Sequence, residues 1–331
     1  MPESLFNPID NLHFDAKTCF LSGAELETED QYIAVFPEWI LDRFSLRDKK
    51  FKMLDQVTDI QYQDMKLPCS PLVREALDSL EEEIQSAFTK GYDEVKKIPY
   101  ERLFQWMGKI VYGVLYNDLC IEIRRASKGP KEKEFKLSPL LKERFGMFHL
   151  MLQSLIMPIQ FKRVKPWSIS IVKLKYSQDI FNYKDEPMNL NFSLGMNGFG
   201  IVACLQDNGI VGKRHQQIIS KIGEKVLHPI QFEELCGSFL YANYLLKYRG
   251  KYNIETIGEK LIFEGILPEK PEDKWFGFWD DNMFAQVLAG YWEPWGLTKK
   301  DIISPPDSPI SFLENDFTNE FIDPESISLP Y

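Results

Sequence analysis

Side chains able to bind a metal or act as nucleophiles are few in this 331-residue sequence and lie far apart. The four histidines show neither i, i+4 pairing nor an H-E-x-x-H pattern, and the five cysteines lie singly along the chain. The sequence has no G-x-x-x-x-G-K-S/T loop and no G-x-S-x-G motif, and GMNGFG at 195–200 lacks the spacing of a dinucleotide site. Zinc-protease, nucleotide-triphosphate and serine-hydrolase signatures are therefore absent.

One N-terminal stretch has an order of motifs that indicates metal chemistry. CFLSG at 19–23 is followed by VFPEWIL at 35–41 and by LPCS at 67–70. This order resembles a bacterial group of HNH-endonuclease-like proteins, whose members carry C-F-L-C-G, E-H-V-F-P-x-W-L-L and P-C-C-x-x-C-N at these places. The resemblance implies a ββα-metal region in which two C-x-x-C knuckles bind a structural zinc. It also implies a nuclease site in which the His after the Glu activates water beside a divalent cation.

The zinc ligands of that family are mostly replaced here. Cys19 matches the first ligand position, but Ser22, Ser70 and Val73 stand at the other three. Cys69 adjoins a ligand position without occupying it. Structural zinc takes four nitrogen or sulfur ligands in a tetrahedron, so a single thiolate does not hold it. We therefore expect no metal and no cofactor, with Cys19 and Cys69 as remnants of the site.

The catalytic pair is replaced as well. On the same alignment, the Glu and His of the family fall on Ile33 and Ala34, whose side chains cannot accept a proton. The hydrophobic frame at 35–41 is kept. The sequence therefore predicts a degenerate HNH-type core, a pseudoenzyme in which apolar packing replaces the metal. Any activity that remained would be that of an HNH-type nuclease.

Positive charge is concentrated in one part of an acidic chain. The net charge is −10, yet residues 124–175 contain thirteen Lys or Arg against three Glu, which leaves −20 on the rest. Such asymmetry is typical of a surface that faces an anion, although a solvated lysine-rich loop would show it too. We predict that this segment binds DNA or RNA, with Trp167 stacking on a base. The expected phosphate contacts are Arg124, Arg125, Lys162, Arg163 and Lys165.

Hydrophobic periodicity predicts the elements that must position these residues. Helical spacing begins at Ser70-Pro71 and ends before Gly91, and it returns at 100–119, after Ser138-Pro139, at 213–227 and at 229–248. Alternation with period two occurs between residues 167 and 205, with Asn197-Gly198 as a hairpin turn. The sequence therefore predicts an α+β fold: helices, a small antiparallel sheet of about three strands, and a helical C-terminal part.

We expect three regions along the chain. Residues 1–97 form the degenerate ββα-metal-like region, and residues 98–303 form a mixed helical and antiparallel-sheet domain. Residues 304–331 form an acidic, Pro-rich tail without Lys or Arg, which we expect to be extended. Three aromatic anchors are expected to hold this tail on the folded body: Phe312, Phe317 and Phe321.

The C-terminal part supports an alternative function. Trp275–Trp295 contains eight aromatic residues within 21 positions, and with the acidic tail it would suit a protein–protein interaction or regulatory protein. A third hypothesis is an enzyme of an unrecognised type, although the sequence shows no combination of acid, base and nucleophile that would indicate a catalytic site. We expect a cytoplasmic protein with reduced cysteines and no membrane partner. The chain starts without a basic, apolar leader, and its longest apolar run is far below about 20 residues.

Overall fold

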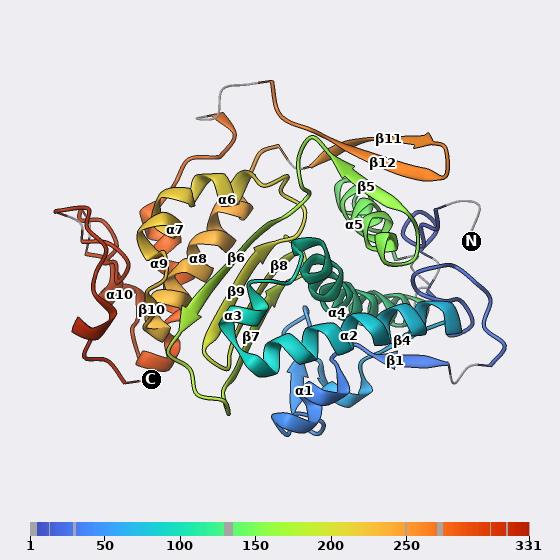
Figure 1. Cartoon of the computed structure of the whole chain (residues 1–331), viewed down its shortest axis with the longest axis horizontal. Helices are drawn as coiled ribbons and strands as arrows, with labels where there is room; N and C mark the ends of the chain where they lie inside the picture. The colour runs from blue at the N-terminus through green and yellow to red at the C-terminus, as the bar shows by residue number, and fades with distance from the viewer. Residues whose placement is uncertain are drawn as a thin grey trace. The chain divides into compact units, whose positions relative to one another are not determined.

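Helices and short strands alternate along the chain, which confirms the α+β class predicted from the sequence (Figure 1). This computed structural model describes residues 5–12, 14–28, 31–128, 135–248, 250–269, 274–304, 306–315 and 317–330. The lysine-rich stretch 129–134 lies outside these ranges. Within them, no helix combines the length and the apolar character needed to cross a bilayer.

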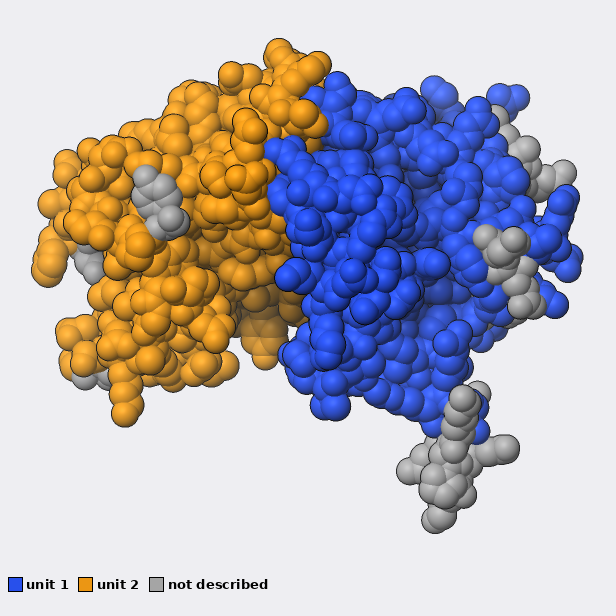
Figure 2. All heavy atoms as spheres, turned by 90° about the horizontal axis from the view of Figure 1, so that it is seen from below, with its two compact units in different colours: residues 1–87, 98–160, 254–263 blue, residues 88–97, 161–253, 264–331 orange. Residues whose placement is uncertain are grey.

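The chain forms two compact units, each built from segments that are separated in the sequence (Figure 2). Unit 1 comprises residues 1–87, 98–160 and 254–263, and unit 2 comprises the rest. The boundaries expected near residues 97 and 303 therefore differ from those of the structure. Helix α4 (Tyr100–Lys128) belongs with the N-terminal region, because Asp118 accepts a hydrogen bond from the Leu54 amide at 3.1 Å.

Unit 1 contains an antiparallel strand pair followed directly by a long helix. β1 (Tyr32–Ala34) pairs with β4 (Lys66–Pro68), and α2 (Pro71–Lys90) follows β4. The start and end of α2 agree with the prediction, since Pro71 occupies the first helical position and Gly91 adopts a φ of 89° just after the last. The apolar face that fixes this helix is buried, and it consists of Val73, Leu77, Leu80 and Ile84.

Short elements and two further helices complete unit 1. α1 (Glu38–Arg43) and an antiparallel pair of β2 (Lys50–Lys52) with β3 (Asp59–Gln61) lie between β1 and β4 in the sequence. α5 (Pro139–Leu152) starts at the Ser138-Pro139 signal, where the Ser138 hydroxyl accepts from the Leu141 amide. A further three-stranded sheet has the order β11-β12-β5, with β11 (Lys251–Ile257), β12 (Lys260–Ile266) and β5 (Ile159–Lys162), and its residues are divided between the two units.

Unit 2 is built on a sheet of five strands, two more than expected. The order is β10-β6-β9-β8-β7, and all neighbours are antiparallel except β10 with β6. The predicted Asn197-Gly198 turn connects β8 to β9, and both residues have positive φ angles. The strands are β6 (Ser168–Leu174), β7 (Phe181–Glu186), β8 (Asn191–Met196), β9 (Phe199–Cys204) and β10 (Val226–Leu227).

Helices pack on this sheet through a common apolar core (Figure 1). Phe232, Leu235 and Phe239 of α8 pack with Val172 of β6 and Val202 of β9. The helix expected to run on from residue 213 is broken, because Gly223 takes a positive φ of 54° and ends it. The helices of this unit are α3 (Tyr92–Val95), α6 (Ile210–Arg214), α7 (Gln216–Ile222), α8 (Pro229–Leu245), α9 (Asp281–Tyr291) and α10 (Lys299–Ile302).

The C-terminal tail lies against unit 2, in line with the extended docking expected for it. Gln231 of α8 donates to the carbonyl oxygens of Phe312 at 2.8 Å and Ile322 at 2.9 Å. The Phe312 ring lies edge-on to Trp292 at 5.2 Å, and Phe321 packs on the sheet–helix core. The expectation for Phe317 is wrong, since its side chain is 98% exposed. Two of the three aromatic anchors therefore hold the tail.

Candidate functional site

Residues 18–25 fold into a tight loop in unit 1. Thr18 bridges to Glu25, the Cys19 amide donates to Ala24 O at 2.8 Å, and the Gly23 amide donates to Cys19 O at 3.0 Å. Gly23 has a φ of 71°, and a Cβ at this position would lie 2.5 Å from the Phe6 ring. Glycine is therefore required here by backbone conformation and by space.

This loop brings Cys19 to the start of α2. The Phe20 amide donates to Pro68 O at 2.8 Å, which places the loop beside Cys69 and Ser70. Both thiols are buried. Hydrogen bonding from Cys69, and then from Ser22 and Ser70, lowers the pKa of Cys19 to about 4 although burial opposes this shift. The same bond with Cys19, together with burial, raises the pKa of Cys69 far above its usual range.

The four side chains at and beside the family's ligand positions thus lie together, but they do not form a zinc site. They offer two sulfurs and two hydroxyls, whereas structural zinc takes four sulfur or nitrogen ligands. Among the described residues, no group of three or more His, Cys, Asp or Glu is placed to hold a metal ion. A backbone hydrogen bond, from the Phe20 amide to Pro68 O, connects the loop to the segment before α2 instead.

A buried lysine occupies the region of the replaced catalytic pair. Lys109 of α4 donates from Nζ to Ala34 O at 2.6 Å and to Val35 O at 2.9 Å, and it pairs with Glu81 of α2 at 2.8 Å. Its side chain is only 4% exposed, and Ile33 is buried. The Lys109 side chain thus connects β1 to α2 and α4, and its contacts are with two carbonyl oxygens and a carboxylate. Sequence analysis missed Lys109, although a lysine within the apolar run of α4 is a visible signal.

His149 supports the same loop from α5. Its Nε2 donates to Phe20 O at 2.7 Å, and its Nδ1 accepts from the Gln153 side-chain amide at 3.3 Å. Both ring nitrogens are used when the imidazole is neutral. Complete burial lowers the pKa of His149 to about 4. This histidine therefore acts in structure and not as a proton carrier near neutral pH.

Acidification is expected to destabilise the chain partly through His149. The folded-state pKa of about 4 lies below the ordinary value of 6.5, so the unfolded chain takes up the proton first as the pH falls. Stability present above pH 6.5 is thus lost between pH 6.5 and pH 4. We expect the contribution of His149 to fall by about 2 kcal/mol between pH 7 and pH 5.

Urea unfolding of the wild type and of His149→Gln at both pH values measures this contribution. The glutamine amide keeps a donor toward Phe20 O but does not titrate. The variant is expected to lose less stability on acidification than the wild type. Equal pH dependence of the two chains would contradict the assignment.

The two predicted phosphate contacts in unit 1 have different environments. Arg125 lies 2.7 Å from carboxylate oxygens of both Asp55 and Glu122, so its charge is compensated within the protein. Arg124 is exposed, and its guanidinium has no ion-pair partner in the described part of the chain. Of these two arginines, Arg124 is therefore the one available to bind an external anion.

The predicted contacts in unit 2 lie in the turn between β5 and β6. Lys162, Arg163 and Lys165 are exposed, and no carboxylate of the described residues forms an ion pair with them. The stacking role expected for Trp167 is wrong: its ring is 4% exposed and packs edge-on to Phe161 at 5.4 Å. The indole belongs to the core and has no free face for a base.

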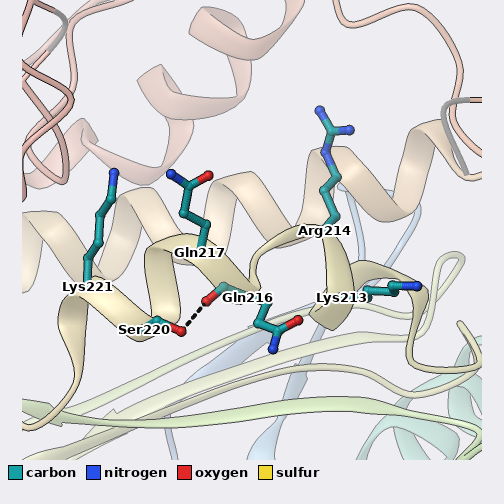
Figure 3. Close-up of a pocket in the computed structure, with 6 residues that line it drawn as sticks. All are labelled: Lys213, Arg214, Gln216, Gln217, Ser220 and Lys221. Carbon is teal, nitrogen blue, oxygen red and sulfur yellow. Dashed lines mark hydrogen bonds between the residues drawn. The ribbon is translucent and has the colours of Figure 1, made fainter.

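Further cations that sequence analysis missed lie on α6 and α7. Lys213, Arg214 and Lys221 line an open pocket of about 690 Å³ with Gln216, Gln217 and Ser220 (Figure 3). Arg214, Gln217 and Lys221 extend from the same side of the helices, as their spacing in the sequence allows (Figure 3). Polar residues at helical spacing, at positions 214, 217 and 221, are the sequence pattern that could have identified this pocket.

Arg214 and Lys221 are held in different ways. The Arg214 guanidinium lies over the rings of Phe276 at 4.8 Å and Trp279 at 5.0 Å, with no carboxylate partner among the described residues. Lys221 pairs with Glu314 of the tail and donates to Asn319 O at 2.8 Å. The tail thus occupies one end of the pocket, and Arg214 remains available at the other.

The β5–β6 turn and α6 are neighbours in unit 2. The amides of Asp207 and Asn208 both donate to Pro166 O at 2.9 Å, and the Lys213 amide donates to Gly209 O at 3.1 Å. The start of α6 therefore lies beside the turn that carries Lys162 and Lys165. We call Lys162, Arg163, Lys165, Lys213 and Arg214 the basic surface.

Most of the aromatic side chains at 275–295 lie in or against the core. Trp275 and Trp292 are buried, and Phe276, Trp279 and Tyr291 pack on the sheet–helix core. Phe278 is the exception, with 86% of its side chain exposed. The aromatic composition of this region is therefore explained mainly by packing.

No protein-family model matches this sequence, and no curated protein or solved structure is significantly similar to it.

Proposed function

We propose that this chain is a non-catalytic relative of the HNH endonucleases that binds nucleic acid through the basic surface. One observation supports the relationship to the HNH endonucleases. Cys19, Ser22, Cys69 and Ser70 lie close together, beside the antiparallel β1–β4 pair and the start of α2. A ββα-metal region with a zinc knuckle would place its ligands in this order and at these elements. This arrangement supports the proposed relationship, in which the zinc ligands have been lost.

The loss of catalysis follows from the residues around β1. Ala34 and Ile33 have no titratable group, and the adjacent Lys109 is buried and held by Ala34 O, Val35 O and Glu81. Hydrolysis of a phosphodiester needs a base for the attacking water and a metal ion for the developing charge. The described residues supply neither at this place.

Binding of a polyanion is supported by cations that the protein leaves uncompensated. Lys162, Arg163 and Lys165 share one turn, and Arg214 is pre-oriented by two aromatic rings. This cluster of cations occurs in a chain whose net charge is −10, so its positive charge is opposite in sign to that of the chain as a whole. Contacts of this kind read the phosphate backbone, so we expect affinity without base specificity.

A charge-reversal variant tests this function. We expect Lys162→Glu/Lys165→Glu to bind duplex DNA at least about tenfold more weakly than the wild type and to reduce the salt slope of log K by about 2, one for each lost phosphate contact. Arg163 is left unchanged because its φ of 67° makes substitution structurally ambiguous. Fluorescence anisotropy at several salt concentrations gives both quantities.

The matched control is Lys274→Glu/Lys300→Glu, which changes the same net charge at exposed lysines of unit 2. It is expected to keep the wild-type salt slope. The same samples, incubated with magnesium or manganese, are expected to show no cleavage of the DNA. Equal slopes for both variants would contradict the assigned surface, and metal-dependent cleavage would contradict the loss of catalysis.

A second candidate function is binding of a protein partner at the aromatic C-terminal region. Phe278, Tyr244 and Met283 are exposed there, and Tyr244 stacks on Tyr241 with ring centroids 6.4 Å apart. Large apolar side chains exposed together favour an interface. A stoichiometric complex that Phe278→Ser abolishes would support this candidate.

A further inference from the structure

A cavity of about 640 Å³ opens on the face of unit 1 beside the β1–β4 pair. Tyr32 of β1, Lys66 of β4, and Tyr116 and Arg124 of α4 line it. This volume is within the range of small-molecule sites in proteins. The cavity is separate from the basic surface, which belongs entirely to unit 2.

Aromatic and aliphatic groups form part of the cavity wall. Phe14 and Tyr116 meet edge to face with ring centroids 5.3 Å apart, and the Tyr116 hydroxyl donates to Asp15 O at 3.2 Å. Tyr32, Ile60 and Ile121 complete these walls. Rings fixed in this way suit a flat, unsaturated ligand, because they stack on it at little cost in side-chain entropy.

The polar groups of the cavity define the rest of the ligand. Arg124 and Lys66 have no side-chain partner among the described residues, and the same holds for Asp64. The Asn117 amide donates to Lys66 O at 3.2 Å and Gly113 O at 2.8 Å, which leaves its Oδ1 free as an acceptor. The site therefore offers two free cations, one free carboxylate and one free carbonyl oxygen.

Two other carboxylates line the cavity, but each is already engaged. Asp59 pairs with Lys50 at 3.6 Å and with Lys52 at 3.1 Å. Asp15 accepts from the Lys17 amide at 2.7 Å. The hydrogen bond from an amide does not by itself neutralise the Asp15 carboxylate, so Asp15 and Asp64 offset the charges of Arg124 and Lys66. The lining therefore favours a ligand that combines an anionic group with hydrogen-bond donors.

We propose that this cavity binds a nucleoside monophosphate. Its phosphate would pair with Arg124 and Lys66, since a guanidinium matches phosphate oxygens in geometry and charge. Its base would stack on the half-buried Tyr32, while the buried Tyr116 ring supports the wall, and Asp64 and Asn117 Oδ1 would accept from amino or ribose hydroxyl groups. The nucleotide can be free in solution or be the terminal residue of a nucleic acid, and both sources share this chemistry.

Cys120 provides a reporter for occupancy of this cavity. It lines the cavity and is partly accessible, whereas the other four cysteines of the chain, all of them described, are buried. Burial raises the pKa of Cys120 to about 11, so its reaction with iodoacetamide is slow and is followed at pH about 10. Because Cys120 is the accessible thiol, it should be modified first. We expect AMP or GMP to slow this reaction about tenfold at saturation, because the ligand covers the thiol.

Calorimetric titration of the full chain gives the affinity, and Arg124→Gln gives the matched test. We expect this variant to weaken mononucleotide binding about tenfold or more, because it removes a charged partner of the phosphate. Lys49→Gln removes the same charge at an exposed position of unit 1 away from the cavity and is expected to bind normally. Cys120→Ser confirms which thiol is alkylated.

Several outcomes would overturn the proposal: no heat and no protection with any mononucleotide, equal affinity of Arg124→Gln and the wild type, or binding of an aromatic amino acid in preference to nucleotides. Short single strands with and without a 5′-phosphate distinguish a terminal residue from free mononucleotide. Duplex binding by Lys162→Glu/Lys165→Glu is measured separately. A negative result for duplex binding at the basic surface therefore does not contradict nucleotide binding in the cavity. A negative result for the cavity likewise does not contradict duplex binding.

Discussion

Replacing Lys109 by methionine is expected to lower the free energy of unfolding by about 3 kcal/mol. The substitution keeps the length of the side chain but removes three hydrogen bonds, to Ala34 O, Val35 O and Glu81. Buried carbonyl oxygens and a carboxylate then lose their partner without gaining full hydration. Such uncompensated groups cost more than the lost ion pair alone.

Chemical denaturation of matched variants separates these contributions. Glu81→Gln keeps an acceptor for Lys109 and is expected to cost about 1 kcal/mol. Lys109→Met/Glu81→Leu removes both charges and is expected to recover part of the loss, as double-mutant cycles show for charges that are left unpaired. Lys97→Met, in the exposed pair with Glu94, serves as the control and should leave stability unchanged. A loss below about 1 kcal/mol in Lys109→Met would refute the role assigned to this lysine.

The second large effect is zinc binding by a variant that carries cysteine at the proposed ligand positions. We expect Ser22→Cys/Ser70→Cys/Val73→Cys to bind one zinc ion per chain with Cys19, whereas the wild type binds none stoichiometrically. Ser22 and Ser70 already lie beside the Cys19 sulfur, and Val73 is one helical turn beyond Ser70 on the buried face of α2. Four thiolates on a loop and a helix start complete a tetrahedron.

Metal analysis and thermal unfolding with and without a chelator measure this effect. Zinc at about 1,000 times its dissociation constant would stabilise the variant by about 4 kcal/mol. Ser22→Ala/Ser70→Ala/Val73→Ala changes the same positions without adding sulfur and should show no response to zinc. The degenerate-knuckle assignment fails if the folded cysteine variant contains no zinc, or if the wild type contains one zinc ion per chain.

The elements with strong local signals were predictable from the sequence. Ser70-Pro71 and Gly91 bound α2, Ser138-Pro139 starts α5, and Asn197-Gly198 makes the turn between β8 and β9. In each case a backbone preference and a hydrophobic period point to the same structure, so neighbouring residues decide the outcome. The α+β class follows from these elements.

Elements whose stability comes from distant partners were missed. β7 is half-buried along its whole length, and β11 is largely exposed, so neither strand has one face that is fully buried. β10 has two residues and exists only because β6 offers a parallel partner. Pairing across the sheet supplies the hydrogen bonds that these short segments cannot form alone.

The amino-acid sequence by itself determined the residue types: Ala34 cannot accept a proton, and the proposed ligand positions contain one cysteine, Cys19. The tertiary structure alone decided what replaced that chemistry and which charges remain free. Lys109 reaches Ala34 across 75 positions, Trp167 is removed into the core, and Arg125 is neutralised by Asp55 while Arg124 is not. The composition of a segment gives its charge, but whether a charge is compensated depends on residues that only folding brings within a few ångströms.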